Sequence, residues 1–284
     1  MSCLSRAISG RFFLQGVYWV LINLNQAGKK CFDTIDPFCK VIERLIVLEF
    51  IPVKPMDKKS KEHVKSISLQ AIIISLLFLA SLGIFALLTH EIVFEKEDWF
   101  DSRTFTFLKN HSSPGIIFFF KQLTFLGSSY FLFPAYIILI GWLLFKKRKT
   151  DAITIAIIAI SSTLLMYILK LLIGRVRPDL PLFEPLSTNS FPSGHSLSSF
   201  IFCSVIVWLV WKSKWGIKLK WILSGLLLLL AISVGISRIV LRYHYASDVL
   251  AGFCMGFAWV LLSFWVQKKM LHSSASSHTT KMRK

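Results

Sequence analysis

Cysteine and acidic residues are both scarce in this sequence. Its 284 residues include five cysteines, no two of which form a CxxC pair, and Cys203 and Cys254 lie inside apolar runs. A disulfide framework and a zinc site are therefore not expected. Asp and Glu number 15 against 33 Lys and Arg, and no pair of carboxylates suited to Mg²⁺ accompanies the polar motifs described below. The sequence thus predicts a protein that requires neither a metal nor another cofactor.

The basic excess gives a formal net charge of +18, which in a soluble protein would suggest a nucleic-acid partner. No recognised nucleic-acid-binding motif accompanies the charge. The basic residues instead fall into short blocks between apolar runs. Lys and Arg in short loops are retained on the cytoplasmic side of a membrane. The charge therefore predicts membrane orientation, and nucleic acid is not expected as a partner.

Long apolar runs are abundant, since 54% of the residues are hydrophobic. About 20 apolar residues cross a bilayer as a helix, and these runs predict an all-α, polytopic membrane bundle with six transmembrane helices. Pro134 is expected to kink the second span or to release one of its backbone carbonyls. Residues 116–120 could extend that span. The six predicted spans are approximately residues 67–88, 123–145, 152–173, 196–211, 221–236 and 246–266.

The basic blocks assign a side to each loop. They precede the first predicted span and follow the second, fourth and sixth. Both termini in the cytoplasm satisfy every block at once. Loops 174–195 and 237–245 then lie on the opposite face, together with the acidic segment 89–122 and a short interfacial helix expected within it. That face is periplasmic in a bacterium, and luminal or exterior in a eukaryote.

Three regions are expected along the chain. Residues 1–66 form an N-terminal cytoplasmic or interfacial extension, with interfacial helices at Phe12–Leu24 and Phe38–Ile51 and no cleavable signal peptide. Residues 67–267 form the six-span domain. Within it, Gly252 and Gly256 form a small-xxx-small pair, which predicts close helix packing. Residues 268–284 form a cytoplasmic polar tail, of which residues 273–284 are expected to be unstructured.

Two polar strings flank the loop 174–195. In the first, Lys170 and Arg177 are seven residues apart, so on one helix they would point the same way, and Pro178 would end that helix. The second is the string PSGH at residues 192–195. Ser193 and Gly194 ahead of a helix offer backbone N–H groups to an anion. His195 supplies an imidazole suited to protonating a leaving group.

The third string is Ser237-Arg238, followed by His244 and Asp248. The last two are four residues apart, so the carboxylate is expected to reach the imidazole. A carboxylate on one ring nitrogen fixes the tautomer and leaves the other nitrogen as a nucleophile. Cations, backbone donors and two histidines on one membrane face are what phosphoryl transfer requires.

Each of these residues also has a possible structural role. A lone Arg near a helix end usually extends toward lipid headgroups, and Arg175 and Arg242 are given that role. Ser193 could serve only as a helix cap. Chance becomes a poor explanation when all three strings occur in order on the same predicted face.

The strings K-x6-RP, PSGH and SR-x5-H-x3-D resemble the motifs of the type 2 phosphatidic acid phosphatase (PAP2) superfamily, which also includes vanadium haloperoxidases. The resemblance covers roughly residues 67–267. It implies that His244 attacks phosphorus and forms a phosphohistidine, that Asp248 orients His244, and that His195 protonates the leaving group. It also implies a phosphate-binding set of Lys170, Arg177, Ser193, Gly194 and Arg238.

The resemblance implies a membrane-integral lipid phosphate or diphosphate phosphatase. Expected substrates are polyprenyl diphosphate such as undecaprenyl diphosphate, phosphatidylglycerol phosphate, phosphatidic acid or a lipid A phosphate. A lipid phosphotransferase would use the same residues. An anion or lipid transporter is disfavoured because the charges lie at one end of the bundle and no inverted repeat is evident. A haloperoxidase fits a lipid-facing bundle poorly.

Overall fold

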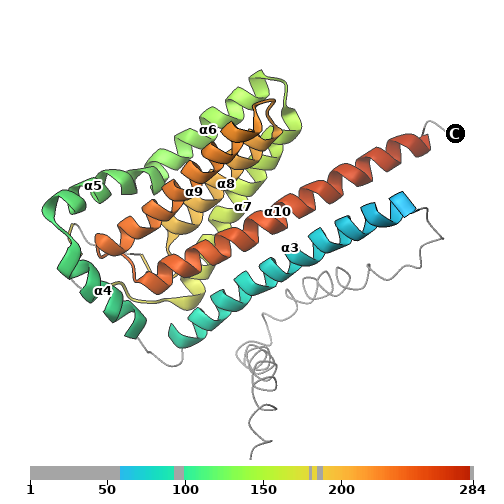
Figure 1. The fold of residues 1–284 in the computed structure, drawn as a ribbon. Helices are drawn as coiled ribbons and strands as arrows, with labels where there is room; N and C mark the ends of the chain where they lie inside the picture. The colour runs from blue at the N-terminus through green and yellow to red at the C-terminus, as the bar shows by residue number, and fades with distance from the viewer. Residues whose placement is uncertain (1–57, 93–98, 179–180, 184–187, 282–284) are drawn as a thin grey trace, which may run out of the picture. The chain divides into compact units, whose positions relative to one another are not determined.

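A computed structural model describes residues 58–92, 99–178, 181–183 and 188–281 of the chain. The two interfacial helices expected before residue 52 lie outside these residues. The chain divides into two units, residues 1–66 and 67–284, and the second is described here. The regular elements of the described residues are all helical, which confirms the predicted class (Figure 1). They are α3 (Lys58–His90), α4 (Trp99–His111), α5 (Pro114–Thr124), η3 (Phe125–Gly127), α6 (Ser129–Phe145), α7 (Lys149–Ile173), α8 (Gly194–Lys212), α9 (Ile217–Val240) and α10 (Ala246–Lys281).

Five of these helices are long and apolar enough to cross a membrane, and the pair α5–η3 and α6 makes a sixth if it is counted as one span. That pair is bent by 43°. The bend lies at Gly127 and Ser128, whereas Pro134 stays inside α6. Ser128 caps α6 by accepting a hydrogen bond from the Phe131 N–H, so a new helix begins there. The 43° bend of this span therefore precedes Pro134, the residue at which a kink was one of the two predicted effects.

The C-terminal helix is longer than predicted. α10 continues to Lys281, through most of the segment expected to be an unstructured tail. Adding residues to an existing helix fixes fewer torsions per hydrogen bond than starting one. The preceding span therefore provides the nucleus that the polar segment lacks alone.

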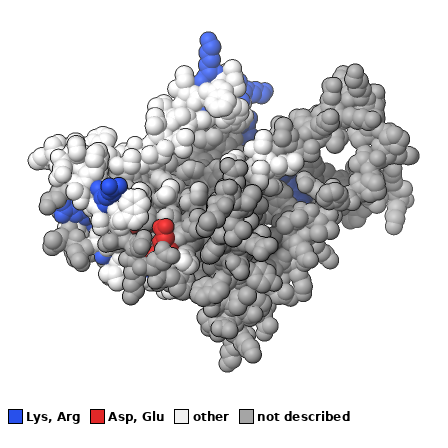
Figure 2. Space-filling view, turned by 60° about the horizontal axis from the view of Figure 1, so that its bottom comes forward, with Lys and Arg blue, Asp and Glu red and all other residues white. Residues whose placement is uncertain are grey.

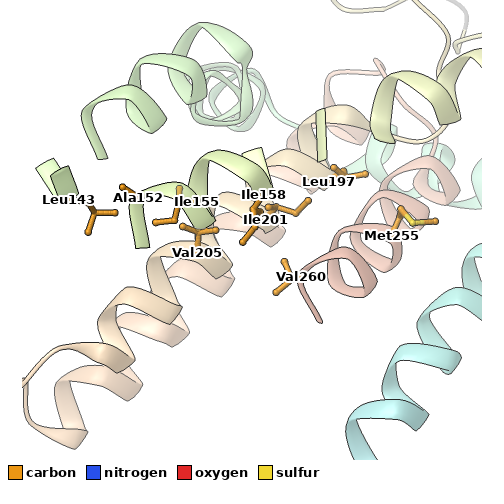
Figure 3. Packing of buried hydrophobic residues seen from close by; sticks show 9 residues of the cluster. All are labelled: Leu143, Ala152, Ile155, Ile158, Leu197, Ile201, Val205, Met255 and Val260. Carbon is orange, nitrogen blue, oxygen red and sulfur yellow. The ribbon is translucent and has the colours of Figure 1, made fainter. Parts of the chain in front are cut away.

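The core lies between the spans, with α8 at its centre. Leu197, Ile201 and Val205 follow one face of α8 and are fully buried, and they pack with residues of α6, α7 and α10 (Figure 3). Large apolar side chains also cover the outside of the bundle. Ile160 on α7 and Ile138 on α6 are each 71% exposed. Figure 2 shows one face on which the described residues are mostly uncharged, with Lys and Arg in a few separate places and one acidic group. Such a surface matches lipid, where helices associate by close packing.

Gly252 and Gly256 provide that close packing, as predicted. A Cβ added to Gly252 would lie 2.7 Å from the Ser193 carbonyl oxygen, and one added to Gly256 would lie 3.3 Å from that of Leu197. Only a residue without a side chain allows α10 to approach the start of α8 this closely. The two glycines thus bring the PSGH string against the first turns of α10.

Candidate active site

The three polar strings meet at one end of the bundle, where α7 and α9 end and α8 and α10 begin. Lys170 lies in the last turn of α7, and Arg238 lies in the last turn of α9. His195 is the second residue of α8, and Asp248 lies in the first turn of α10. The Ser193 N–H donates to the Asp248 carbonyl oxygen at 3.0 Å, which ties the second string to the third.

Lys170 and Arg177 do not share a helix, which corrects the prediction made from their spacing. α7 ends at Ile173, and Gly174 follows in the left-handed conformation with φ 66°. Glycine adopts that conformation without steric cost and commonly ends helices. Arg177 therefore lies on the extended segment beyond the helix, and Pro178 does not end it.

The imidazole of His244 is buried and held from both sides. Its Nδ1 lies 3.3 Å from Oδ2 of Asp248 and 3.4 Å from Oγ of Ser190. Its Nε2 lies 3.2 Å from Nη1 of Arg177. An ionised carboxylate only accepts hydrogen bonds and a guanidinium only donates them. Both contacts therefore select the neutral tautomer with the proton on Nδ1 and a lone pair on Nε2.

Burial is the largest influence on the protonation of His244. Burial disfavours the charged imidazolium and lowers the pKa of His244 to about 4. The hydrogen bond and the charge of Asp248 act in the opposite direction but are smaller. The nearby charges of Arg177 and Arg238 lower the pKa further. At neutral pH the ring is uncharged, so its Nε2 carries a lone pair.

Three cations surround the histidines. Lys170 Nζ donates to the Asn189 carbonyl oxygen at 2.5 Å, while the Asn189 side chain donates to the Lys170 carbonyl oxygen at 2.8 Å. Arg177 donates to the Thr188 and Tyr243 carbonyl oxygens at 2.6 and 2.7 Å. All of the three predicted cations, including Arg238, are close enough to His195 to act on it electrostatically.

Arg238 is the cation whose hydrogen bonding is incomplete. Its Nη1 donates to Thr124 Oγ1 at 2.9 Å. Its Nε is buried and makes no hydrogen bond to any part of the chain that the structure describes. Buried donors are nearly always paired in proteins. An unpaired N–H in this position is available to an oxygen of a bound anion.

The PSGH string begins α8. The Ser193 side chain accepts a hydrogen bond from the Ser196 N–H and lies 2.9 Å from Ser196 Oγ. Ser193 is therefore the N-cap of α8, and Gly194 is the first residue of the helix. The N–H groups of a first helical turn are suited to binding an anion.

Arg175 lies at the candidate site, where the sequence interpretation did not place it. Its side chain is only 12% exposed and forms ion pairs with Asp101 at 2.8 Å and with Asp248 at 2.7 Å. The expectation that it extends toward headgroups was therefore wrong. Asp101 precedes Arg175 by 74 residues, and no pattern in the sequence links the two. Ser190 was also missed, although it stands two residues before the PSGH string.

Among residues 58–92, 99–178, 181–183 and 188–281, no three His, Cys, Asp or Glu side chains gather closely enough to hold a metal ion. The polar groups that do gather here are cations and histidines. They suit an anionic ligand.

Residues 151–271 match the model of the PAP2 superfamily. Phosphatidylglycerophosphatase B of Bacillus subtilis is 37% identical over 154 residues, which cover 51% of this chain and 70% of the relative. The chain belongs to the PAP2 superfamily. The undecaprenyl-diphosphatase of Sulfolobus acidocaldarius is 30% identical over 124 residues, which cover 42% of this chain and 55% of that protein.

The crystal structure of a transmembrane PAP2-type phosphatidylglycerolphosphate phosphatase from Bacillus subtilis has a similar fold. The TM-score is 0.63 at 29% identity, and the match covers 68% of this chain and 96% of that one. The predicted family and membrane fold are confirmed. The chain is an integral membrane protein and a phosphatase of the PAP2 type that acts on lipid phosphates.

Proposed function

We propose that this PAP2 enzyme removes the terminal phosphate of a membrane lipid through a phosphohistidine formed on His244. The observation that carries the proposal is the environment of this side chain. Asp248 contacts Nδ1, Arg177 contacts Nε2, and burial keeps the ring neutral. A neutral imidazole with a fixed tautomer is the form that attacks phosphorus.

In the first step the Nε2 lone pair of His244 forms a bond to phosphorus. The bond from phosphorus to the lipid oxygen breaks, and that oxygen takes a proton from His195. The leaving group is an alcohol for a phosphomonoester and a lipid monophosphate for a diphosphate. The phosphate dianion brings negative charge next to His195, which favours its protonated, acid form.

In the second step a water molecule attacks the phosphohistidine. His195, now neutral, takes a proton from the water, the bond between phosphorus and Nε2 breaks, and inorganic phosphate leaves. Asp248 keeps the proton on Nδ1 through both steps. No step of this sequence calls for a metal.

The phosphoryl oxygens are bound by Lys170, Arg177 and Arg238, together with the start of α8 at Ser193 and Gly194. The unpaired Nε of Arg238 supports this role. Negative charge grows on those oxygens during the transfer. Donors already fixed in place stabilise it without reorganising.

The substrate is a lipid with an exposed phosphomonoester or diphosphate. Relatives are named for phosphatidylglycerophosphate, lipid A 1-phosphate and undecaprenyl diphosphate. These compounds share a terminal phosphate and differ in the apolar part. Together with phosphatidic acid, they define the set to be tested.

The active site faces away from the cytoplasm. The basic turn 146–149 joins α6 to α7, and the basic turn 212–220 joins α8 to α9. Both turns lie at the ends of α7, α8 and α9 that are remote from the site. The positive-inside rule assigns those turns to the cytoplasm.

Phosphate release by detergent-purified protein tests the proposal, with the four lipids offered separately and EDTA present. Release by the wild type and its loss in His244→Ala is the expected result. His111→Ala is the matched control, since His111 is an exposed histidine of α4. Release that requires a metal, or transfer of the phosphoryl group to a second lipid in preference to water, would contradict the proposal.

A further inference from the structure

We propose that Arg175 and Asp101 are positioning residues for the reaction, because they hold the carboxylate of Asp248 in the orientation in which it supports His244. The inference rests on the proposed function of His244. It extends the catalytic pair into a buried chain of four groups that runs from His244 through Asp248 and Arg175 to Asp101.

Arg175 lies between the two carboxylates and bonds to both. Nη1 donates to Asp248 Oδ1 at 2.7 Å, and Nη2 donates to Asp101 Oδ2 at 2.8 Å. The Asp248 side chain is fully buried and that of Asp101 is 4% exposed. Charge-assisted bonds of this length in a buried position define orientation as well as attraction.

The two oxygens of Asp248 have separate contacts. Oδ2 faces His244 Nδ1 and accepts hydrogen bonds from Ser190 Oγ and from the Tyr245 N–H. Oδ1 is held by Arg175. With both oxygens engaged, the carboxylate cannot rotate away from the imidazole. Loss of Arg175 would remove the bond on Oδ1, so only the contacts of Oδ2 would orient the carboxylate.

Asp101 lies at the other end of this hydrogen-bonded network, remote from His244. It lies in the first turn of α4 and accepts hydrogen bonds from the backbone N–H and the hydroxyl of Ser247, at 2.9 and 2.6 Å. Ser247 directly precedes Asp248 and also bonds to Arg175 at 2.8 Å. Asp101 therefore fixes both the guanidinium and the backbone that carries the catalytic carboxylate.

The charges within this network of four side chains are compatible with one another. Burial acts to lower the pKa of Arg175, but the two carboxylates outweigh it and raise the pKa above its ordinary value. The guanidinium also lies over the ring of Tyr245 at 3.9 Å. Arg175 is thus a permanent cation placed behind Asp248, on the side away from His244.

A second ion-pair cluster provides a matched control. Asp151 in the first turn of α7 bonds to Arg148 at 2.7 Å and to Lys212 at 2.6 Å. Like Asp248 with its partners, it is a shielded carboxylate that joins separate segments. It lies at the opposite end of α7 from the site. Its loss should therefore change stability without changing the chemistry.

The test compares Arg175→Gln, Arg175→Lys, Asp101→Asn and Asp151→Asn in steady-state phosphate release and in thermal unfolding. For Arg175→Gln we expect kcat to fall ~10–100-fold at nearly unchanged KM, by analogy with the losses seen when residues that orient metal ligands are replaced. Asp101→Asn should lower kcat less, since Arg175 remains. Arg175→Lys should restore part of the loss, because it returns the charge without the forked geometry.

The pH profile separates positioning from stability alone. In Arg175→Gln the acid limb of kcat should move to higher pH, because Asp248 must be ionised and has lost its cation. Asp151→Asn should lower Tm and leave both kcat and the profile unchanged. Arg175→Gln and Asp101→Asn could instead lower Tm as Asp151→Asn does and keep the wild-type kcat and pH profile. Arg175 and Asp101 would then have only a structural role, and the inference would fail. If Arg175→Gln does not fold, Asp101→Asn alone decides.

The two proposals fail in different ways. An active His244→Ala variant would remove the proposed function and the basis of this inference with it. An inactive His244→Ala variant beside fully active Arg175 and Asp101 variants would leave the function standing and overturn only the inference.

Discussion

Nη1 of Arg177 lies 3.2 Å from Nε2 of His244. The cation that is proposed to receive the phosphoryl oxygens therefore contacts the nitrogen that is proposed to attack. Until a phosphate is bound, the guanidinium occupies the nitrogen's lone pair. We expect a bound phosphate to offer Arg177 stronger acceptors and so to free the lone pair for attack on phosphorus.

Replacement of Arg177 by lysine tests this double role. Lysine keeps the charge and loses the planar fork that bonds to Thr188, Tyr243 and His244. We expect kcat/KM to fall by ~10²–10³, the usual loss for one oriented donor to a developing anion. Lys220→Arg, on the remote basic turn, is the control and should be neutral. An Arg177→Lys enzyme with wild-type kcat/KM would remove the need for the fork.

Acid should destabilise the protein through His244. The folded pKa of about 4 lies below the ordinary value of 6.5, so the unfolded chain binds more protons between these values. The contribution of His244 to the free energy of unfolding is fully present above about pH 6.5. It is lost as the pH falls toward about 4, by roughly 1.4 kcal/mol per pH unit at most.

Unfolding in detergent as a function of pH checks this contribution. His244→Asn should have a flatter dependence of Tm on pH between about 4 and 6.5. The wild-type enzyme should also keep kcat/KM without a fall caused by His244 until the pH approaches 4. Identical slopes for the two proteins would show that burial does not act on His244 in this way.

Gly252→Ala should disturb the site from the side of α10. Its Cβ would lie 2.7 Å from the Ser193 carbonyl oxygen, which belongs to backbone and cannot turn aside. We expect a loss of ~1–3 kcal/mol in stability together with reduced activity, since overpacking shifts the backbone. Gly141→Ala in α6 is the control, because nothing lies within 4 Å of its added Cβ.

Gly141→Ala should leave activity unchanged and slightly raise stability, since alanine favours helix. If Gly252→Ala behaves like Gly141→Ala, the contact of α10 with the PSGH string does not define the site.

Ser190→Ala should weaken the support of the catalytic pair. The Ser190 hydroxyl is buried and donates to Asp248 Oδ2. A hydrogen bond to a charged group is worth ~1.5–3 kcal/mol, so we expect kcat to fall by about tenfold or more. Ser199→Ala, a buried serine further along α8, should be near normal. Equal activity of the two variants would exclude a role for the Ser190 hydroxyl.

The spans and the strings could be predicted from the sequence because each depends on local information. Long apolar runs predict membrane-spanning helices. A spacing of four residues, as between His244 and Asp248, predicts a contact between side chains on one helical turn. The pairing of Arg175 with Asp101 depends on how α4 folds back against the start of α10. No local sequence pattern indicates this contact between α4 and α10. A single Arg near a helix end, such as Arg175, is instead expected to extend toward lipid headgroups.

Two helix ends were predicted only in part. The predicted span 152–173 ends where α7 does, whereas the spacing argument continued the same helix to Pro178. α7 ends at Gly174, ahead of the more conspicuous Pro178. The second span bends at Gly127, ahead of Pro134. At Gly127 an added Cβ would lie 2.4 Å from Val234 on α9, so the need for glycine arises from a tertiary contact. Proline is the usual helix breaker, but neither break lies at a proline.

The most direct test is to trap the phosphoenzyme. The purified protein would be given a lipid substrate labelled with ³²P in its terminal phosphate, with EDTA present, and quenched in alkali within the first turnover. The account predicts an acid-labile, alkali-stable label on the peptide that contains His244, absent from His244→Asn and present in the control His111→Ala. Label on another residue, or phosphate release by His244→Asn at the wild-type rate, would contradict it.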